Sequence, residues 1–243
     1  MRRRPEKRKK KKNKMSDKFS ELESKIGFSF KDKDLLLTAL THRSYLNENP
    51  GWRLDHNERL EFLGDAVLEL VVTEYLFKNY PNPEGEMTNW RAALVNANIL
   101  SKITGEFDLN DYVLLSRGEA KDTGRARQYI LANAIEALIG AIYLDQGYEP
   151  CIEFINRFIL KELPTIIEKR LYRDAKSLFQ EMAQDKVGIT PTYEVLKEWG
   201  PDHARNFEVG VFLEKELIGT GQGPSKQEAQ QQAAEDALAK KGW

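Results

Sequence analysis

Three carboxylates recur at helical spacing in the run ERLEFLGD. On a helix that turns by about 100° per residue, Glu58, Glu61 and Asp65 fall within a stripe of about 60°. Like charges on neighbouring turns destabilise an isolated helix, so we expect a compensating cation. The basic residue within the run, Arg59, lies on a different face. The pattern favours a semi-buried cluster that binds a hard divalent ion such as Mg²⁺. Spacing alone leaves a solvated acidic face as the alternative.

A second stretch offers oxygen ligands one helical turn apart, at Asn133 and Glu136. The residues around them are small: Ala132, Ala134, Ala137, Gly140 and Ala141. A helix with small residues can approach a neighbour closely, so we expect Asn133 and Glu136 to face the first acidic stripe. If the small residues serve packing alone, Glu136 is left unexplained in an apolar run. Oxygen ligands for a metal between two helices would suit phosphodiester hydrolysis, in which the metal activates water and stabilises the leaving oxygen.

Composition limits the other kinds of chemistry. The single cysteine, Cys151, excludes an internal disulfide, and the three histidines are too far apart in sequence for zinc-ligand spacing. There is no secretory signal pattern and no apolar run of about 18 residues that could span a membrane. We therefore expect a cytoplasmic protein without a membrane partner.

The first part of the chain has a helical pattern, because apolar residues recur three and four positions apart. Helices are predicted over 34–46, 57–80, 87–107, 128–147 and 149–170. They indicate an all-helical domain over residues 15–170.

The pattern changes near residue 171. A helix at about 174–186 precedes three short segments with alternating apolar residues, Thr192–Leu196, Asn206–Leu213 and Glu216–Thr220, and a last helix follows at about 225–241. The odd-numbered apolar positions of the first two strands, Tyr193 and Val195 among them, are expected to be buried. Residues 171–243 are thus predicted to form a small α-β-β-β-α domain.

Residues 1–14 hold ten Lys or Arg and one acid, which leaves −10 on residues 15–243 when the whole chain carries −1. A tail of this kind is expected to be disordered by its own repulsion and attracted to polyanions. It is either an RNA-binding arm or a dispensable extension before a start at Met15.

The run HNERLEFLGDA over residues 56–66 resembles the signature of the ribonuclease III family. The resemblance continues through THRSY at 41–45, EGEM at 84–87 and LANAIEALIGA at 131–141. The C-terminal pattern is similar to a double-stranded-RNA-binding domain. The implied fold is an all-α endonuclease domain followed by a small α+β (α-β-β-β-α) double-stranded-RNA-binding domain.

The resemblance implies a homodimeric endoribonuclease that cuts double-stranded RNA with Mg²⁺, for which Mn²⁺ can substitute. It would leave 5′-phosphates and 3′-hydroxyls with a short 3′ overhang and would process ribosomal RNA precursors and structured mRNA. The implied site residues are the metal ligands Glu61, Asp65, Asn133 and Glu136, of which Asp65 and Glu136 are catalytic, the supporting acids Glu58 and Glu84, and the dimer-contact residue Phe62.

Asn133 departs from the family pattern, which most often has Asp at this position. An amide oxygen still coordinates a cation, but one negative charge is lost, and metal affinity depends on ligand charge. We expect a working enzyme with a higher Mg²⁺ requirement.

Residues 171–243 carry nine Lys or Arg and twelve Asp or Glu, so their charge does not indicate RNA binding. The positions of particular residues in the resembling domain do indicate RNA binding, because double-stranded RNA is recognised mainly by shape. The implied RNA-binding residues are Gln180, Glu181, His203, Ser225 and Lys226. Because Gln227 stands where a second lysine is usual, we expect weak binding by one isolated domain.

Two other classes stay open. A catalytically impaired RNA-binding or ribonucleoprotein structural protein on the same fold would show eroded acids, and Asn133 alone is eroded. A helical scaffold or dimerisation module would leave the α-β-β-β-α domain without a purpose.

Overall fold

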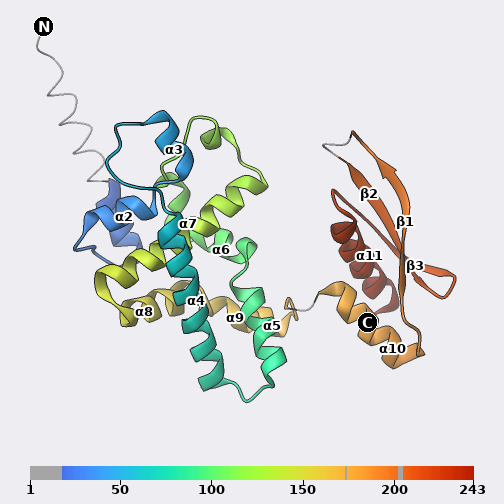
Figure 1. Ribbon diagram of the computed structural model, residues 1–243. Coiled ribbons are helices and arrows are strands. Elements are labelled where there is room, and N and C mark those ends of the chain that lie inside the picture. The colour runs from blue at the N-terminus through green and yellow to red at the C-terminus, as the bar shows by residue number, and fades with distance from the viewer. Residues whose placement is uncertain (1–17, 173, 202–204) are drawn as a thin grey trace, which may run out of the picture. The chain divides into compact units, whose positions relative to one another are not determined.

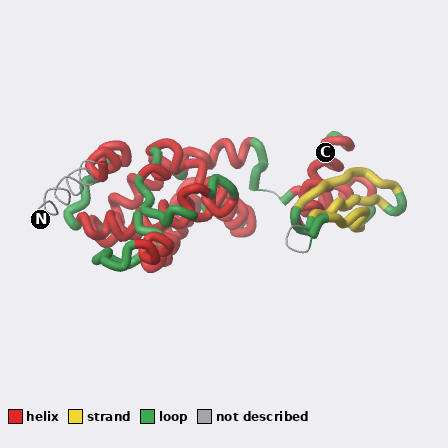
Figure 2. Tube along the Cα trace, turned by 90° about the horizontal axis from the view of Figure 1, so that it is seen from above, coloured by secondary structure: helices red, strands yellow, loops and turns green. Residues whose placement is uncertain are grey.

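The computed structural model describes residues 18–172, 174–201 and 205–243. The chain divides into two compact units, one up to Tyr172 and the other from residue 173 (Figure 1). We call them the helical unit and the α+β unit. The predicted fold class, a helical domain followed by a small α-β-β-β-α domain, is confirmed (Figure 2).

The helical unit begins, within the described residues, with a helix over residues 18–26. The helices that follow are α2 (Lys33–Ala39), α3 (Arg43–Glu48), α4 (Glu58–Asn79), α5 (Glu84–Leu94), α6 (Ala97–Thr104), α7 (Arg125–Gln146), α8 (Tyr148–Phe158) and α9 (Leu163–Glu168). One continuous apolar core joins them.

The helix predicted over 34–46 is two helices, α2 and α3. Between them Thr41 is extended and forms an isolated bridge with Leu114, and the backbone N–H of Leu114 donates to the carbonyl of Leu40. His42 then caps α3 by accepting from the N–H of Ser44. This interruption depends on a pairing with a distant segment, so helical periodicity alone could not reveal it.

Two more predicted helices are divided. Over 87–107, the side chain of Asn96 accepts from the backbone N–H groups of Asn98 and Ile99 and thereby begins α6. Over 149–170, a short 3₁₀ turn separates α8 from α9. The ranges predicted over 57–80 and 128–147 are single helices, α4 and α7.

Helices α4 and α7 cross at the centre of the helical unit (Figure 1). A Cβ atom added to Gly64 of α4 would lie 1.8 Å from the carbonyl oxygen of Glu136. One added to Gly140 of α7 would lie 2.2 Å from the carbonyl oxygen of Leu60. The two backbones are therefore in direct contact, and glycine is required on both sides of the crossing.

In the α+β unit, helices α10 (Ala175–Val187) and α11 (Lys226–Lys241) flank an antiparallel sheet in the order β1 (Thr192–Trp199), β2 (Asn206–Leu213) and β3 (Glu216–Gly223). β1 and β3 extend three residues beyond the predicted ends. Val209 and Val211 of the central strand are buried against Phe179 of α10 and the alanines of α11. The expectation that Val195 is buried is wrong: it is 43% exposed, and it lies on β1 where the pairing with β2 becomes irregular.

The glycine contact gives a stability prediction. Gly140→Ala places a methyl group against the backbone of α4, so we expect the free energy of unfolding of the helical unit to fall by about 2 to 3 kcal/mol. Gly105→Ala is the matched control, since its Cβ has nothing within 4 Å and its φ is −66°. Denaturant unfolding of both variants is the measurement. Equal stability would show that the two helices are not held at backbone contact.

Candidate active site

The N-terminal half of α4 carries the predicted acidic stripe. Asn57 precedes the helix and is buried, and its backbone N–H donates to the carbonyl of Thr41 over 2.9 Å. This bond fixes the start of α4 to the segment between α2 and α3. Glu58 and Glu61 lie in the first turn, where the helix dipole favours negative charge.

Helix α7 carries Asn133 and Glu136 among buried small residues. Both side chains are partly buried. The backbone of Glu136 lies against Gly64, and Asp65 is the residue after Gly64. Asp65 therefore lies at the same crossing. The structure therefore brings the predicted pair on α7 to the predicted stripe on α4.

The charges at this crossing interact. Burial raises the pKa of Glu136 to about 8, and the negative charges of Asp65 and Glu61 contribute to the same shift. Burial also raises the pKa of Glu61, and the charge of Glu58 adds to this shift, while the side chain of Asn133 acts in the opposite direction. These four residues and Glu58 thus form one electrostatically coupled group across the two helices.

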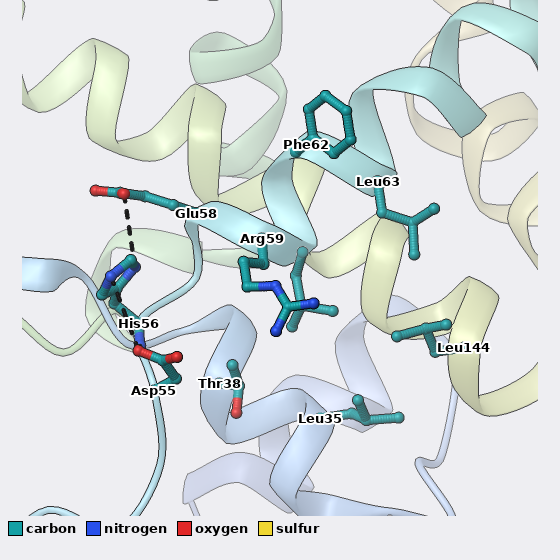
Figure 3. Close-up of a pocket in the computed structure, with 10 residues that line it drawn as sticks. Leu35, Thr38, Asp55, His56, Glu58, Arg59, Phe62, Leu63 and Leu144 are labelled. Atoms are coloured by element: carbon teal, nitrogen blue, oxygen red, sulfur yellow. Dashed lines mark hydrogen bonds and ion pairs between the residues drawn. The ribbon is translucent and has the colours of Figure 1, made fainter.

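Glu58 lies at the edge of this group, next to Arg43 and His56. Nη1 of Arg43 lies 3.4 Å from Oε1 of Glu58, and Nδ1 of His56 lies 3.8 Å from Oε2 (Figure 3). Glu58 is half exposed, so each pair contributes little to stability. The sequence reasoning missed both residues as parts of the site. The one signal for them was the presence of each in a motif of the resembling family.

Glu84 is not brought to this group within one chain. It begins α5 and lines a separate pocket with Phe77 and Thr73 near the C-terminal end of α4. The twelve residues from Asp65 to Phe77 correspond to about 18 Å along the helix. A supporting role for Glu84 at the crossing would therefore require a second copy of the chain.

Phe62 projects from α4 with 82% of its surface exposed. It borders a pocket of about 740 Å³ whose apolar walls include Leu35, Leu63 and Leu144 (Figure 3). Arg59 and Glu58 line the same pocket. An exposed aromatic ring beside an apolar pocket is a typical feature of a contact surface.

The RNA-binding candidates in the α+β unit lie on two adjacent helices. Gln180 and Glu181 are exposed on α10. Ser225 caps α11 by accepting from the N–H of Glu228, and the ammonium group of Lys226 lies 5.6 Å from the centre of the Phe207 ring. The first turn of α10 is joined to α11, because Nζ of Lys176 donates to Oε1 of Gln230 over 2.8 Å.

His203 and the basic residues 1–14 lie outside the described residues, so the predictions for them stay as they were. In the described part of the chain, no helix is long and apolar enough to cross a membrane. There, too, no three His, Cys, Asp or Glu side chains converge closely enough to form a complete set of metal ligands. Asn133 supplies an additional oxygen donor at the crossing.

Comparisons with known proteins identify the family of both units. Residues 32–163 match the family described as Ribonuclease-III-like, and residues 175–241 match the double-stranded RNA binding motif. Ribonuclease 3 of a Nitratiruptor species is 47% identical over 219 residues, covering 90% of this chain and 94% of the relative. Ribonuclease 3 of Desulforamulus reducens is 44% identical over 227 residues, covering 93% and 92%.

A solved structure of the nuclease domain of ribonuclease III from Campylobacter jejuni, which concerns flexibility in a region involved in dimer formation, is also similar. It has a TM-score of 0.54 and 44% identity, and the match covers 59% of this chain and 97% of that domain. Both units are therefore matched to the same kind of protein, and the coupled acids lie in the matched helical unit. The chain belongs to the ribonuclease III family.

Proposed function

We propose that this endoribonuclease hydrolyses both strands of double-stranded RNA with Mg²⁺, leaving 5′-phosphate and 3′-hydroxyl ends with a short 3′ overhang. The observation that carries the proposal is the crossing of α4 and α7, where Glu61, Asp65 and Glu136 are electrostatically coupled with Asn133 among them. The family membership and the double-stranded RNA binding motif over 175–241 support the substrate class.

The donor set fits a hard divalent cation. Carboxylate and amide oxygens are the ligands that Mg²⁺ prefers, and Mn²⁺ accepts the same ligands. Glu61 and Glu136 both have raised pKa values, so a nearby positive charge would stabilise their ionised forms. The residues that would hold the cation are Glu61, Asp65, Asn133 and Glu136.

A bound divalent cation supplies a Lewis acid that polarises the scissile phosphate and neutralises charge on the leaving oxygen. The chain's own residues would hold that centre in place: Asp65 and Glu61 of α4 lie close enough to Glu136 of α7 for their charges to raise its pKa. An incoming water oxygen would attack phosphorus, the bond to the 3′ oxygen would break, and the 3′ oxygen would take up a proton.

A homodimer is part of the proposal. Phe62 of one copy would insert into an apolar pocket of the other, such as the one beside Leu63 and Leu144. Since Glu84 is remote from the crossing in its own chain, the partner copy would supply any Glu84 that supports the site. Two sites in one dimer would cut the two RNA strands.

The α+β unit would present double-stranded RNA to these sites through Gln180, Glu181, His203, Ser225 and Lys226. The N-terminus of a helix with a lysine beside it can bind a phosphate group. Ser225 and Lys226 provide this arrangement at the start of α11. Ribosomal RNA precursors and structured mRNA are the substrates that we propose, and the cytoplasm, where such transcripts are processed, is the proposed location.

Cleavage of a long perfect RNA duplex tests the function. With Mg²⁺ the wild-type protein should cut the duplex, and with EDTA it should bind without cutting. Glu136→Gln removes a proposed ligand charge, so we expect binding to persist and the cleavage rate to fall at least about 100-fold. Glu153→Gln, an exposed Glu on α8, is the matched control and should cut normally. Binding without cutting by the wild type at any Mg²⁺ concentration would overturn the proposed cleavage.

The amide at position 133 gives a metal prediction. Asn133→Asp restores a fourth negative ligand, so half-maximal cleavage should require roughly three- to tenfold less Mg²⁺ than in the wild type, because affinity depends on ligand charge. A titration of initial cleavage rate against Mg²⁺ measures this requirement. An unchanged requirement would mean that the lost charge does not limit metal binding.

The raised pKa of Glu136 gives a pH prediction. Between about pH 4.5 and 8 the folded protein retains a proton on Glu136 that the unfolded chain has released, so this group's contribution to stability is lost as pH rises through that range. We expect the Tm in EDTA to fall with pH over this window by a few degrees more in the wild type than in Glu136→Gln. Calorimetry from about pH 5.5 to 9 measures both slopes, and parallel curves would contradict the assigned shift.

A further inference from the structure

The last residue of the helical unit, Tyr172, is held by an aromatic contact. Its ring meets that of Trp90 on α5 edge to face, with the ring centres 6.0 Å apart and the ring planes at 78°. Trp90 is 4% exposed and meets the ring of Tyr80 in the same way, with the centres 5.1 Å apart. Tyr172 is itself partly buried against the apolar core. Three aromatic rings thus fix the end of the helical unit to α5.

The backbone just before Tyr172 forms a tight turn at the end of α9. The N–H of Leu171 donates to the carbonyl of Ile166 over 2.9 Å, and the N–H of Arg170 donates to the carbonyl of Ile167 over 3.1 Å. This is the hydrogen-bond pattern of a Schellman motif, in which glycine is usual at the position of Arg170. Arg170 nevertheless has a φ of 51°. A residue with a side chain keeps such a conformation where its surroundings impose it. The turn leads the chain toward α5, which lies beside α9 (Figure 1).

The first described residue of the α+β unit is also held. Asp174 caps α10, because its Oδ2 accepts from the backbone N–H of Ser177 over 3.2 Å and from the Ser177 hydroxyl over 3.1 Å. Ala175 is already part of the core of this unit. A single position of the sequence, 173, therefore separates the anchored Tyr172 from the capped Asp174. Two peptide units span at most about 7 Å, so the tether between the two anchored residues is very short.

We propose that Tyr172 is a positioning residue for cleavage: its ring, held by Trp90, keeps the tether of the α+β unit at one residue and so limits the reach of that unit. The inference rests on the proposed cleavage of double-stranded RNA for its purpose. A duplex bound by the α+β unit is offered to the helical unit at an effective concentration that depends on the tether. Without the ring contact, residues 170–172 would join the tether, which would then have four residues.

The first test is Tyr172→Ala in the full chain. The tether would grow from about two to about five peptide units, and effective concentration falls roughly as the −3/2 power of length, so the KM for a long RNA duplex should rise about three- to fivefold. The kcat should change by less than about twofold, because the catalytic residues are untouched. Tyr172→Phe keeps the ring and should retain the wild-type KM. Leu171→Ala changes the preceding side chain, which is 58% exposed, and is the matched control.

An insertion separates tether length from any damage to the fold. Gly-Ser-Gly placed between Tyr172 and residue 173 leaves the ring contact intact and lengthens the tether by the same three residues. It should therefore raise the KM as much as Tyr172→Ala does. In the Tyr172→Ala background the same insertion should add only about twofold, because the tether is already long. A wild-type KM unchanged by the insertion, or an equal rise in Tyr172→Ala and Tyr172→Phe, would show the positioning role to be wrong.

Limited digestion with trypsin tests the anchor without RNA or metal. The bond after Arg170 lies within the turn, so in EDTA it should be cut at least about threefold faster in Tyr172→Ala than in the wild type or Tyr172→Phe. Equal rates in the three proteins would contradict the anchor. Failure of the wild type to cleave RNA would instead contradict the proposed function and leave the digestion result standing. If Tyr172→Ala does not fold, the insertion into the wild type still decides whether tether length controls the KM.

Discussion

The backbone contact between α4 and α7 is the constraint on which the candidate active site depends. Packed helices usually lie about 8 to 10 Å apart because side chains separate their axes, but Gly64 and Gly140 bring these two backbones into contact. Asp65 follows Gly64 on α4, and the backbone of Glu136 on α7 lies against Gly64. The charge of Asp65 can therefore act on Glu136 across the crossing, which larger residues at the glycine positions would prevent. The acids come close together because Gly64 and Gly140 have no side chains to separate the two helices.

The same contact makes the site electrostatically unfavourable. Partial burial removes water from Glu61 and Glu136, and the nearby carboxylates raise the cost of ionising both: Glu58 and Asp65 act on Glu61, and Asp65 and Glu61 act on Glu136. The chain offsets this cost in two ways that the structure shows. The first turn of α4 provides the positive end of its dipole to Glu58 and Glu61, and Arg43 approaches Glu58. Neither places a full positive charge inside the crossing, which is the place where a divalent cation would act.

The sequence predicted those parts of the site that depend on local spacing. Periodicity placed the acids of α4 on one face, and small residues around Glu136 indicated a close helix contact. It could not predict Arg43 beside Glu58, because that contact depends on the path of the chain from α3 to the start of α4. Nor could it place Glu84, whose position is set by the direction of α5 and not by its own neighbours. The division of the helix over 87–107 was within reach, since Asn96 is a typical N-cap residue, whereas the bridge of Thr41 with Leu114 is a tertiary contact.

The charge of the α+β unit illustrates the limit of composition as a guide to binding. Residues 171–243 carry a net charge of −3, yet the unit belongs to a class that recognises double-stranded RNA. Shape recognition needs few cations if they are placed at the right distance along the duplex, and Lys226 at the start of α11 is the cation that we propose for this role. With few phosphate contacts in each unit, affinity would have to come from simultaneous binding by two units. A dimer supplies both units at a high effective concentration. The dimer that would assemble two cleavage sites is thus also the form in which a weakly charged RNA-binding unit becomes sufficient.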